Sequence, residues 1–149
     1  MQTDFRPPFR RLQDGESRDV YKRQAMRRAE LEKFILDNYN TKSDHPWIKY
    51  PNYTVFRHSN QKWFAVIMDI SKNKLGLFGS DTIDVANFKC DPILLGSFLG
   101  EPGFFPAYHM NKERWITVLL DGSVADEKIK MLLHMSYEAT APKYSKKRK

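Results

Sequence analysis

Residues 53–70 decide the fold of this chain, and they read YTVFRHSNQKWFAVIMDI. Two runs rich in aromatic and β-branched residues, 53–58 and 62–70, flank the short polar segment Ser59-Asn60-Gln61. Such runs are typical of β-strands, and a short polar segment between two of them is typical of a hairpin loop. The sequence therefore predicts two antiparallel strands here.

The residues that follow predict a continuation of the sheet. Residues 75–78 and 82–88 form a second, weaker pair of strand-like runs, separated by Gly79-Ser80-Asp81, whose small and polar side chains suit a turn. Residues 114–120 are rich in residues that favour β-strands and predict one more strand, which a turn at Asp121-Gly122 ends.

Two helices are indicated by spacing and by a start signal. Residues 27–39 place Leu31 and Ile35 at helical spacing, together with Phe34 and Tyr39, so an amphipathic helix is predicted. Asp91-Pro92 predicts a second helix that runs to Leu99, because Asp accepts hydrogen bonds from free N–H groups and Pro fits the first helical position.

A closing helix is predicted from Ser123 onward. Ser123 and Asp126, three residues later, form a start like a capping box. The apolar stripe that follows comprises Val124, Ile129, Leu132, Leu133 and Met135, and it ends before Pro142. This order of elements predicts an α+β fold in which an antiparallel sheet carries the N- and C-terminal helices on one face.

The net charge of +7 belongs to the two ends of the chain. Residues 1–24 carry six Lys or Arg and four Asp or Glu, residues 143–149 carry five basic and no acidic residues, and residues 25–142 carry 14 of each. Blocks of like charge are usually solvated. We expect one domain over residues 26–142, a disordered or artefactual leader over 1–25, and a basic disordered tail over 143–149.

The leader contains an unusual motif. Residues 19–24 read DVYKRQ, which matches the in-frame translation of the transposon mosaic end used in sequencing-library preparation. Residues 1–24 also lack a helical or strand period. They are either an assembly scar, with Met26 as the native start, or a flexible arm.

The sequence lacks the features of membrane-spanning, secreted and disulfide-bonded proteins. It has no run of about 18 to 20 apolar residues and no secretory signal, so we expect a cytoplasmic protein with no membrane partner. Its one cysteine, Cys90, excludes an internal disulfide.

Three motifs are distinctive: YPNYTVFRH at 50–58, KCDP at 89–92, and PAYHMNK at 106–112 followed by Trp115. They resemble motifs of the MmcQ/YjbR family, small proteins described as DNA-binding, with a frataxin-like (CyaY-like) fold. The similarity extends from Met26 to about Ala141. It implies a CyaY-like α+β fold and binding to DNA.

Residues 108–115, YHMNKERW, combine stacking, hydrogen-bonding and cationic groups, the mixture that nucleic-acid surfaces use for bases and phosphates. The candidate nucleic-acid-binding residues are Lys89, Tyr108, His109, Asn111, Lys112, Arg114 and Trp115. A structural interpretation also fits: Tyr108 and Trp115 would be core aromatics, with His109 and Asn111 fastening the loop. The favoured partner is duplex DNA, bound through phosphate contacts that include the tail.

A small-ligand or protein-interaction module is the alternative function. Phe104-Phe105-Pro106 is an apolar segment in a predicted loop, which suggests a pocket or patch. His45-Pro46-Trp47 and Tyr50-Pro51 place more aromatics in a connector, either as core anchors or as part of a ligand surface.

Enzyme activity has little support. Lys89 beside Cys90, with His109 and Asn111, offers a Cys-His-Asn set, but Asp91 suffices as a helix cap and a free Cys is usually buried. His45, His58, His109 and His134 lack metal-ligand spacing. The helix over 27–39 mixes charges, unlike the acidic iron-associated ridge of frataxins. We expect no catalysis, cofactor or metal.

Overall fold

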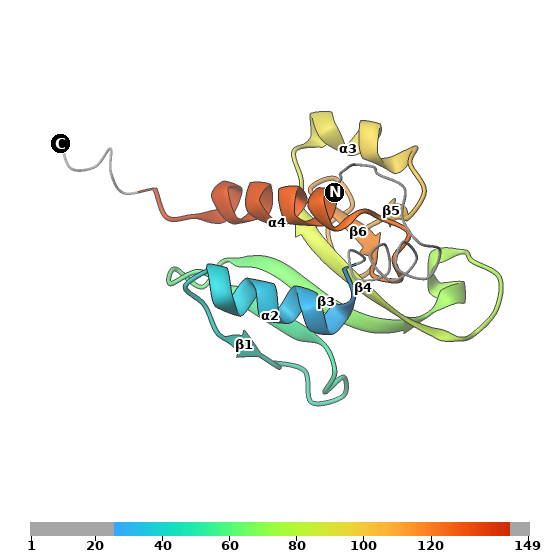
Figure 1. Ribbon diagram of the computed structural model, residues 1–149, viewed down its shortest axis with the longest axis horizontal. Helices are drawn as coiled ribbons and strands as arrows, with labels where there is room; N and C mark the ends of the chain where they lie inside the picture. The colour runs from blue at the N-terminus through green and yellow to red at the C-terminus, as the bar shows by residue number, and fades with distance from the viewer. Residues whose placement is uncertain (1–25, 144–149) are drawn as a thin grey trace, which may run out of the picture.

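The computed structural model describes residues 26–143, so the leader and all of the basic tail except Lys143 lie outside the described residues. Within this range the chain forms three α-helices and a six-stranded sheet (Figure 1). The helices are α2 (Arg28–Asn38), α3 (Pro92–Leu99) and α4 (Asp126–Thr140). The strands are β1 (Ser43–Asp44), β2 (Thr54–Arg57), β3 (Trp63–Ser71), β4 (Thr82–Lys89), β5 (Phe104–Pro106) and β6 (Trp115–Leu119).

The sheet is antiparallel throughout, with the spatial order β1-β2-β3-β4-β6-β5. The hairpin predicted over residues 53–70 is present as β2 and β3, which pair from Thr54 opposite Ile67 onward. The predicted α+β class is therefore confirmed.

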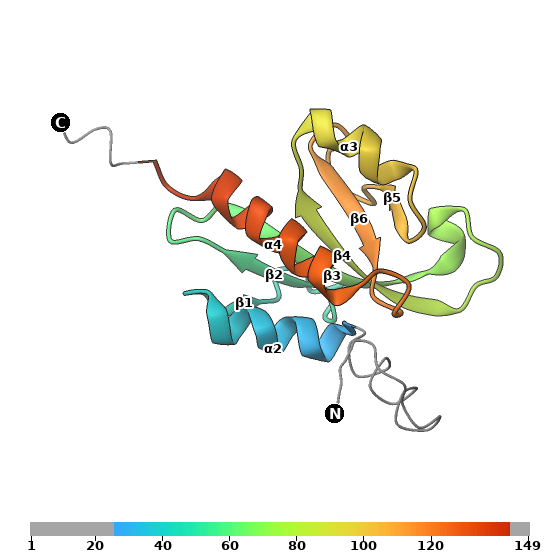
Figure 2. The same cartoon turned by 45° about the horizontal axis from the view of Figure 1, so that its top comes forward.

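Helices α2 and α4 lie side by side across one face of the sheet (Figures 1 and 2). Leu31 and Ile35 of α2 and Ile129 of α4 are fully buried there, against Phe64 and Phe88 of the sheet. Burying a side chain of this size contributes about 1.5–3 kcal/mol. The predicted placement of the N- and C-terminal helices on one face is confirmed.

The predicted start of α3 is also confirmed. The Asp91 carboxylate accepts a hydrogen bond of 2.8 Å from the Ile93 N–H, and Pro92 occupies the first turn. Phe98 stacks on Phe104 with ring centroids 5.4 Å apart, which seats α3 against β5.

The strand predicted over residues 75–78 is wrong. Strand β3 continues to Ser71 and pairs directly with β4, so that Ser71 faces Thr82. The chain between them makes a 3-10 turn, η1 (Lys72–Leu75), which ends at Gly76 with φ of +79°. Since this left-handed conformation favours glycine and breaks an extended run, the apolar residues of 75–78 form a connection instead of a strand.

Two other predictions need correction. Residues 104–106 form a strand, because Phe104 and Pro106 pair with Val118 and Ile116 of β6. The closing helix begins at Asp126 and not at Ser123, and Ala125 occupies its N-cap position. The Ser123 hydroxyl and N–H both donate to the Asp121 carboxylate, so Ser123 belongs to the turn that precedes α4.

No helix in the range 26–143 is both long enough and apolar enough to cross a lipid bilayer.

Candidate functional site

The second face of the sheet is covered by loops, because the buried side chains of all three described helices join the core on the first face. Strand alternation divides β4 accordingly: Ala86 and Phe88 face the helices, whereas Val85 and Asn87 face the other way. We call this second side the loop-covered face. Its aromatic cover includes Trp47 and Tyr53 from the connector before β2, Phe105 from β5, and Tyr108 from the loop after β5.

A buried polar pair fastens one of these connectors to the sheet. The Thr117 hydroxyl donates a hydrogen bond to Asn87 Oδ1, and both side chains are fully buried. The same hydroxyl oxygen accepts the backbone N–H of Tyr108 at 2.9 Å. The hydrogen bond to Thr117 in β6 therefore holds the main chain of Tyr108 against the loop-covered face of the sheet.

The aromatic candidates from the sequence have different environments. Tyr108 is partly exposed and its ring lies 4.1 Å from that of His109, which is exposed and has a φ of +63°. Trp115 is only 9% exposed and lies directly opposite Lys89 in the sheet. Trp115 is therefore a core residue with no free ring face for a base, as the structural interpretation expected.

The polar candidates partly serve the loop itself. Asn111 Oδ1 accepts the Glu113 N–H at 2.8 Å, and Lys112 Nζ donates to the Ala107 carbonyl at 2.9 Å. Arg114 is exposed at the start of β6, and its carbonyl accepts the Cys90 N–H. Lys89, which pairs with Trp115, and Lys112, which is hydrogen-bonded to Ala107, therefore lie on the same loop-covered face as Tyr108.

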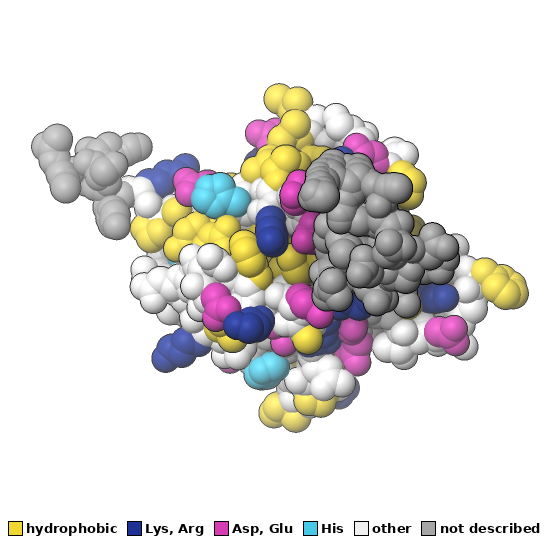
Figure 3. All heavy atoms as spheres, viewed as in Figure 1, with side chains coloured by type: hydrophobic (Ala, Val, Ile, Leu, Met, Phe, Trp, Pro, Cys, Tyr) yellow, Lys and Arg dark blue, Asp and Glu magenta, His cyan; other side chains and the backbone are white. Residues whose placement is uncertain are grey.

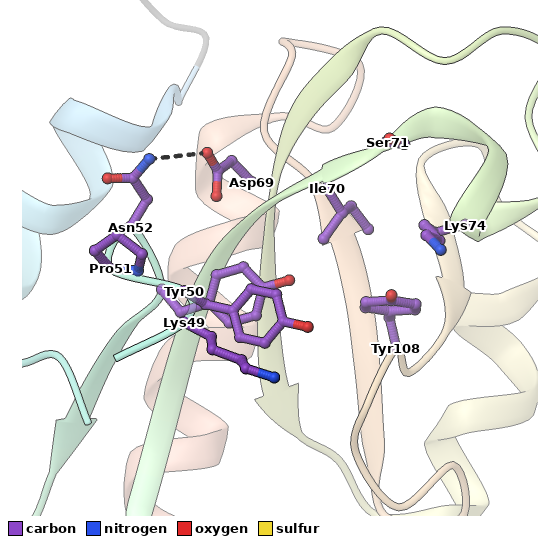
Figure 4. A pocket seen from close by; sticks show the side chains of 10 residues that line it. Lys49, Tyr50, Pro51, Asn52, Asp69, Ile70, Ser71, Lys74 and Tyr108 are labelled. Carbon is purple, nitrogen blue, oxygen red and sulfur yellow. Dashed lines mark hydrogen bonds between the residues drawn. The ribbon is translucent and has the colours of Figure 1, made fainter. Parts of the chain in front are cut away.

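Phe104 and Phe105, which suggested a pocket or patch, pack into the protein, and a cavity of about 540 Å³ lies away from them, where residues 40–44 and 57–59 line it. Phe104 is buried against Phe98, and Phe105 packs into the core of the loop-covered face. A second cavity, of about 440 Å³, lies beside Tyr108 (Figure 4). It is lined by Lys49, Tyr50, Pro51, Asn52, Tyr53, Asp69, Ile70, Ser71, Lys74 and Tyr108.

The aromatic wall of this cavity is a stacked pair. The rings of Tyr50 and Tyr53 are 4.7 Å apart and inclined by 13°. Burial raises the pKa of Tyr53, and the nearby Tyr108, Tyr50 and Asp69 raise this pKa further. The Tyr53 phenol is therefore protonated at neutral pH and can donate a hydrogen bond.

The charged groups of the cavity are mainly cationic. Neither Lys49 nor Lys74 forms an ion pair with a carboxylate of residues 26–143. The Asp69 carboxylate accepts a hydrogen bond of 3.1 Å from Asn52 Nδ2, which Figure 4 shows at the opposite end of the cavity from Tyr108. Sequence reasoning missed Lys49, Asn52, Asp69 and Lys74 as functional candidates. It did draw attention to this region through the motif at 50–58 and through Tyr50-Pro51, one of whose two interpretations was part of a ligand surface.

Cys90 lies apart from the other members of the Cys-His-Asn set. Its side chain is 3% exposed in the core on the helix side, whereas His109 belongs to the loop over the other face. Burial raises the pKa of the Cys90 thiol, and the adjacent Asp91 carboxylate raises it further. In the described part of the chain, no three His, Cys, Asp or Glu side chains group as metal ligands.

Comparison with known proteins places this architecture among close relatives. YyaQ of Bacillus subtilis (strain 168) is 39% identical over 114 residues, which cover 76% of this chain and 97% of YyaQ. A crystal structure of a Pseudomonas syringae protein matches with 47% identity and a TM-score of 0.76, over 77% of this chain and 99% of that one. A solution NMR structure from Pseudomonas syringae matches with 45% identity and a TM-score of 0.72, over 80% and 96%.

The fold extends to a more distant protein. The crystal structure of Deinococcus radiodurans DR2400 is 22% identical, with a TM-score of 0.59 over 76% of this chain and 78% of that one. The family model YjbR matches residues 36–139, well over half of the sequence. Together with the near full-length match to YyaQ, this establishes that the chain belongs to the YjbR family.

Proposed function

We propose that this protein binds nucleic acid without catalysing a reaction, with duplex DNA as one partner. One observation carries the proposal: Lys49, Lys74, Lys89 and Lys112 lie on or beside the loop-covered face, and none forms an ion pair with a carboxylate of the described residues. Cations that are free of carboxylate partners are available to phosphates.

The helix side of the molecule has a different charge pattern. Its cations are largely neutralised, as in the pairs Arg28 with Glu32 and Lys33 with Asp37. Figure 3 shows basic and acidic side chains interspersed over this side, around a hydrophobic seam between α2 and α4. On the helix side, acidic and basic side chains thus offset one another, in line with the equal numbers of acids and bases in residues 25–142.

Two further observations support the proposal. MmcQ/YjbR proteins, which the motifs of this chain resemble, are described as DNA-binding. The basic residues of 143–149 add a second, sequence-independent attraction for phosphate. Because the domain itself carries no net charge, we expect weak binding that depends strongly on salt.

The test is fluorescence anisotropy of a labelled DNA duplex across a salt series, with the whole chain and with a chain that lacks residues 143–149. Each neutralised phosphate contributes a slope of about −0.9 in log K against log salt. We expect the double substitution Lys74→Ala with Lys89→Ala to reduce the slope of the tail-less chain by about two.

The matched control removes the same charge from the helix side, by Lys33→Ala with Lys130→Ala. If both double variants weaken binding equally, the loop-covered face has no special role and the proposal is wrong. The proposal is equally wrong if binding disappears with the tail.

A further inference from the structure

The cavity beside Tyr108 combines three chemical features. Tyr50, Tyr53 and Tyr108 supply aromatic rings with phenolic hydroxyls, and Ile70 supplies an apolar surface. Lys49 and Lys74 both line the cavity, and Figure 4 shows Lys49 on the side of Tyr50 and Lys74 on the side of Tyr108. Aromatic rings next to cations suit a planar ring that carries an anionic group.

We propose that this cavity binds one unpaired nucleotide, with its base against the tyrosine rings and its phosphate at the ammonium groups of Lys49 and Lys74. The inference rests on the proposed function in taking a nucleic acid as the source of that nucleotide. A free mononucleotide offers the same chemistry, and the experiment below separates the two sources.

The aromatic groups are arranged for stacking. Tyr50 is 46% exposed and is supported from behind by its stacked partner Tyr53. The hydrogen bond from the Tyr108 N–H to Thr117 holds the main chain on the other side of the cavity, and the half-buried Tyr108 ring packs against the core of the loop-covered face. Rings that are fixed before binding lose little conformational entropy when a base stacks on them.

The size and charge of the cavity also fit. Its volume of about 440 Å³ falls within the range of about 300–1,000 Å³ that is usual for small-ligand pockets. The one carboxylate in its lining, Asp69, is hydrogen-bonded to Asn52. This leaves the end near Tyr108 and Lys74 to an anion.

A paired base cannot use such a site. In a duplex the two faces of each base are stacked on neighbouring bases, so contact with a tyrosine ring requires an unpaired or extruded nucleotide. The cavity therefore predicts a preference for single strands, in addition to the phosphate contacts that a duplex also makes.

The experiment measures the affinity of the whole chain for a labelled single-stranded oligothymidylate and for a duplex of equal length. We expect the single strand to bind about tenfold more tightly than the duplex, and Tyr50→Ala to remove about tenfold of that affinity. Phe78→Ala is the matched control, because Phe78 is fully exposed and does not line the cavity.

The charge contribution is tested with Lys49→Ala and Lys74→Ala together. The control pair is Lys42→Ala with Lys62→Ala, two exposed lysines outside the cavity. We expect the first pair to weaken oligothymidylate binding at least about fivefold more than the second at low salt. Circular dichroism checks that each variant is folded.

Calorimetric titration with thymidine 5′-monophosphate separates the two sources. Single-strand preference that depends on Tyr50 supports the inference, with nucleic acid as the source. If the protein binds the mononucleotide, if Tyr50→Ala weakens this binding, and if neither the single strand nor the duplex binds, the cavity site is supported and the proposed function is contradicted. Equal binding of duplex and single strand, unchanged by Tyr50→Ala, overturns the inference and leaves the proposed function standing. Absence of all binding overturns both.

Discussion

The Thr117 hydroxyl donates its hydrogen to Asn87 Oδ1 in the middle of the sheet, and its oxygen accepts the N–H of Tyr108. Thr117→Val keeps the shape of the side chain but leaves both of these partners unsatisfied in a buried place. Since a buried unsatisfied polar group costs about 1–3 kcal/mol, we expect the variant to lose about 2 kcal/mol or more of its free energy of unfolding, measured in urea.

Thr82→Val is the matched control, because Thr82 is exposed at the start of β4. A free energy of unfolding that is the same in Thr117→Val as in the unmodified protein would show that the pair does not stabilise the sheet. If Tyr108 depends on this contact, Thr117→Val should also weaken oligothymidylate binding.

The cap of α3 gives a second prediction. Asp91→Ala removes the acceptor for the Ile93 N–H, and we expect it to lower the free energy of unfolding by about 1 kcal/mol. Asp91→Asn keeps an oxygen at the same position and should lose only a few tenths of that amount. Equal losses in the two variants would contradict a capping role and indicate an effect of charge.

Two glycines predict opposite responses to alanine. Gly103 has a φ of +89°, and a Cβ atom there would overlap the Val124 side chain, so Gly103→Ala should destabilise the protein by more than about 1 kcal/mol. Gly96 lies inside α3 with open space around it, so Gly96→Ala should stabilise the protein by about 0.5–1 kcal/mol. Thermal and urea unfolding of both variants would measure the difference, and shifts of the same sign would contradict it.

Acid should lower the contribution of the turn at Asp121–Ser123 to the stability of the folded state. Burial acts to raise the pKa of Asp121, but the hydrogen bonds from the Ser123 hydroxyl and N–H and the charge of Arg27 lower this pKa below its usual 3.8. A carboxyl group with a lower pKa in the folded state stabilises it above the unfolded pKa, and this stabilisation is lost as the pH falls through the folded pKa.

Ser123→Ala removes the side-chain hydrogen bond to Asp121. We therefore expect the unmodified protein to be more stable than Ser123→Ala at neutral pH, with a difference that shrinks well below pH 3.8. Urea unfolding at the two pH values measures it. A difference that is constant with pH would assign the effect of the serine to something other than the Asp121 charge.

The thiol of Cys90 should react slowly. Because it is buried and its pKa is raised, first by burial and then by Asp91, little thiolate is present at neutral pH. We expect iodoacetamide to modify the folded protein much more slowly than the urea-unfolded protein. Rapid modification of the folded state would revive a nucleophilic role for this cysteine.

Local signals explain which parts of the fold the sequence could predict. The hairpin of β2 and β3 and the start of α3 depend on neighbouring residues, namely a polar loop between strand-like runs and the pair Asp91-Pro92. The end of β3 depends on its distant partner β4, so the sequence around 75–78 alone could not show that pairing had already ended at Ser71. Ser123 misled for a related reason, since it pairs with Asp121 and not with the helix.

The site was less predictable than the fold. Tyr108 could be identified from its motif, but the motif could not show that the ring of Trp115 is buried or that Lys112 donates to a carbonyl of its own loop. The other wall of the cavity comes from residues more than fifty positions earlier, Lys49 and Tyr50, which only the folded sheet brings close to Tyr108.

The lengths of the two border strands affect whether a strand of another chain can pair with the sheet. β1 has two residues and β5 has three, the last of them Pro106, whereas the long strands β3 and β4 lie in the interior. Such short border strands, one of which ends in a proline, offer few free backbone groups to an incoming strand. This sheet, as described over residues 26–143, therefore gives an extended chain little to pair with at either border, which disfavours growth by addition of strands from a second molecule.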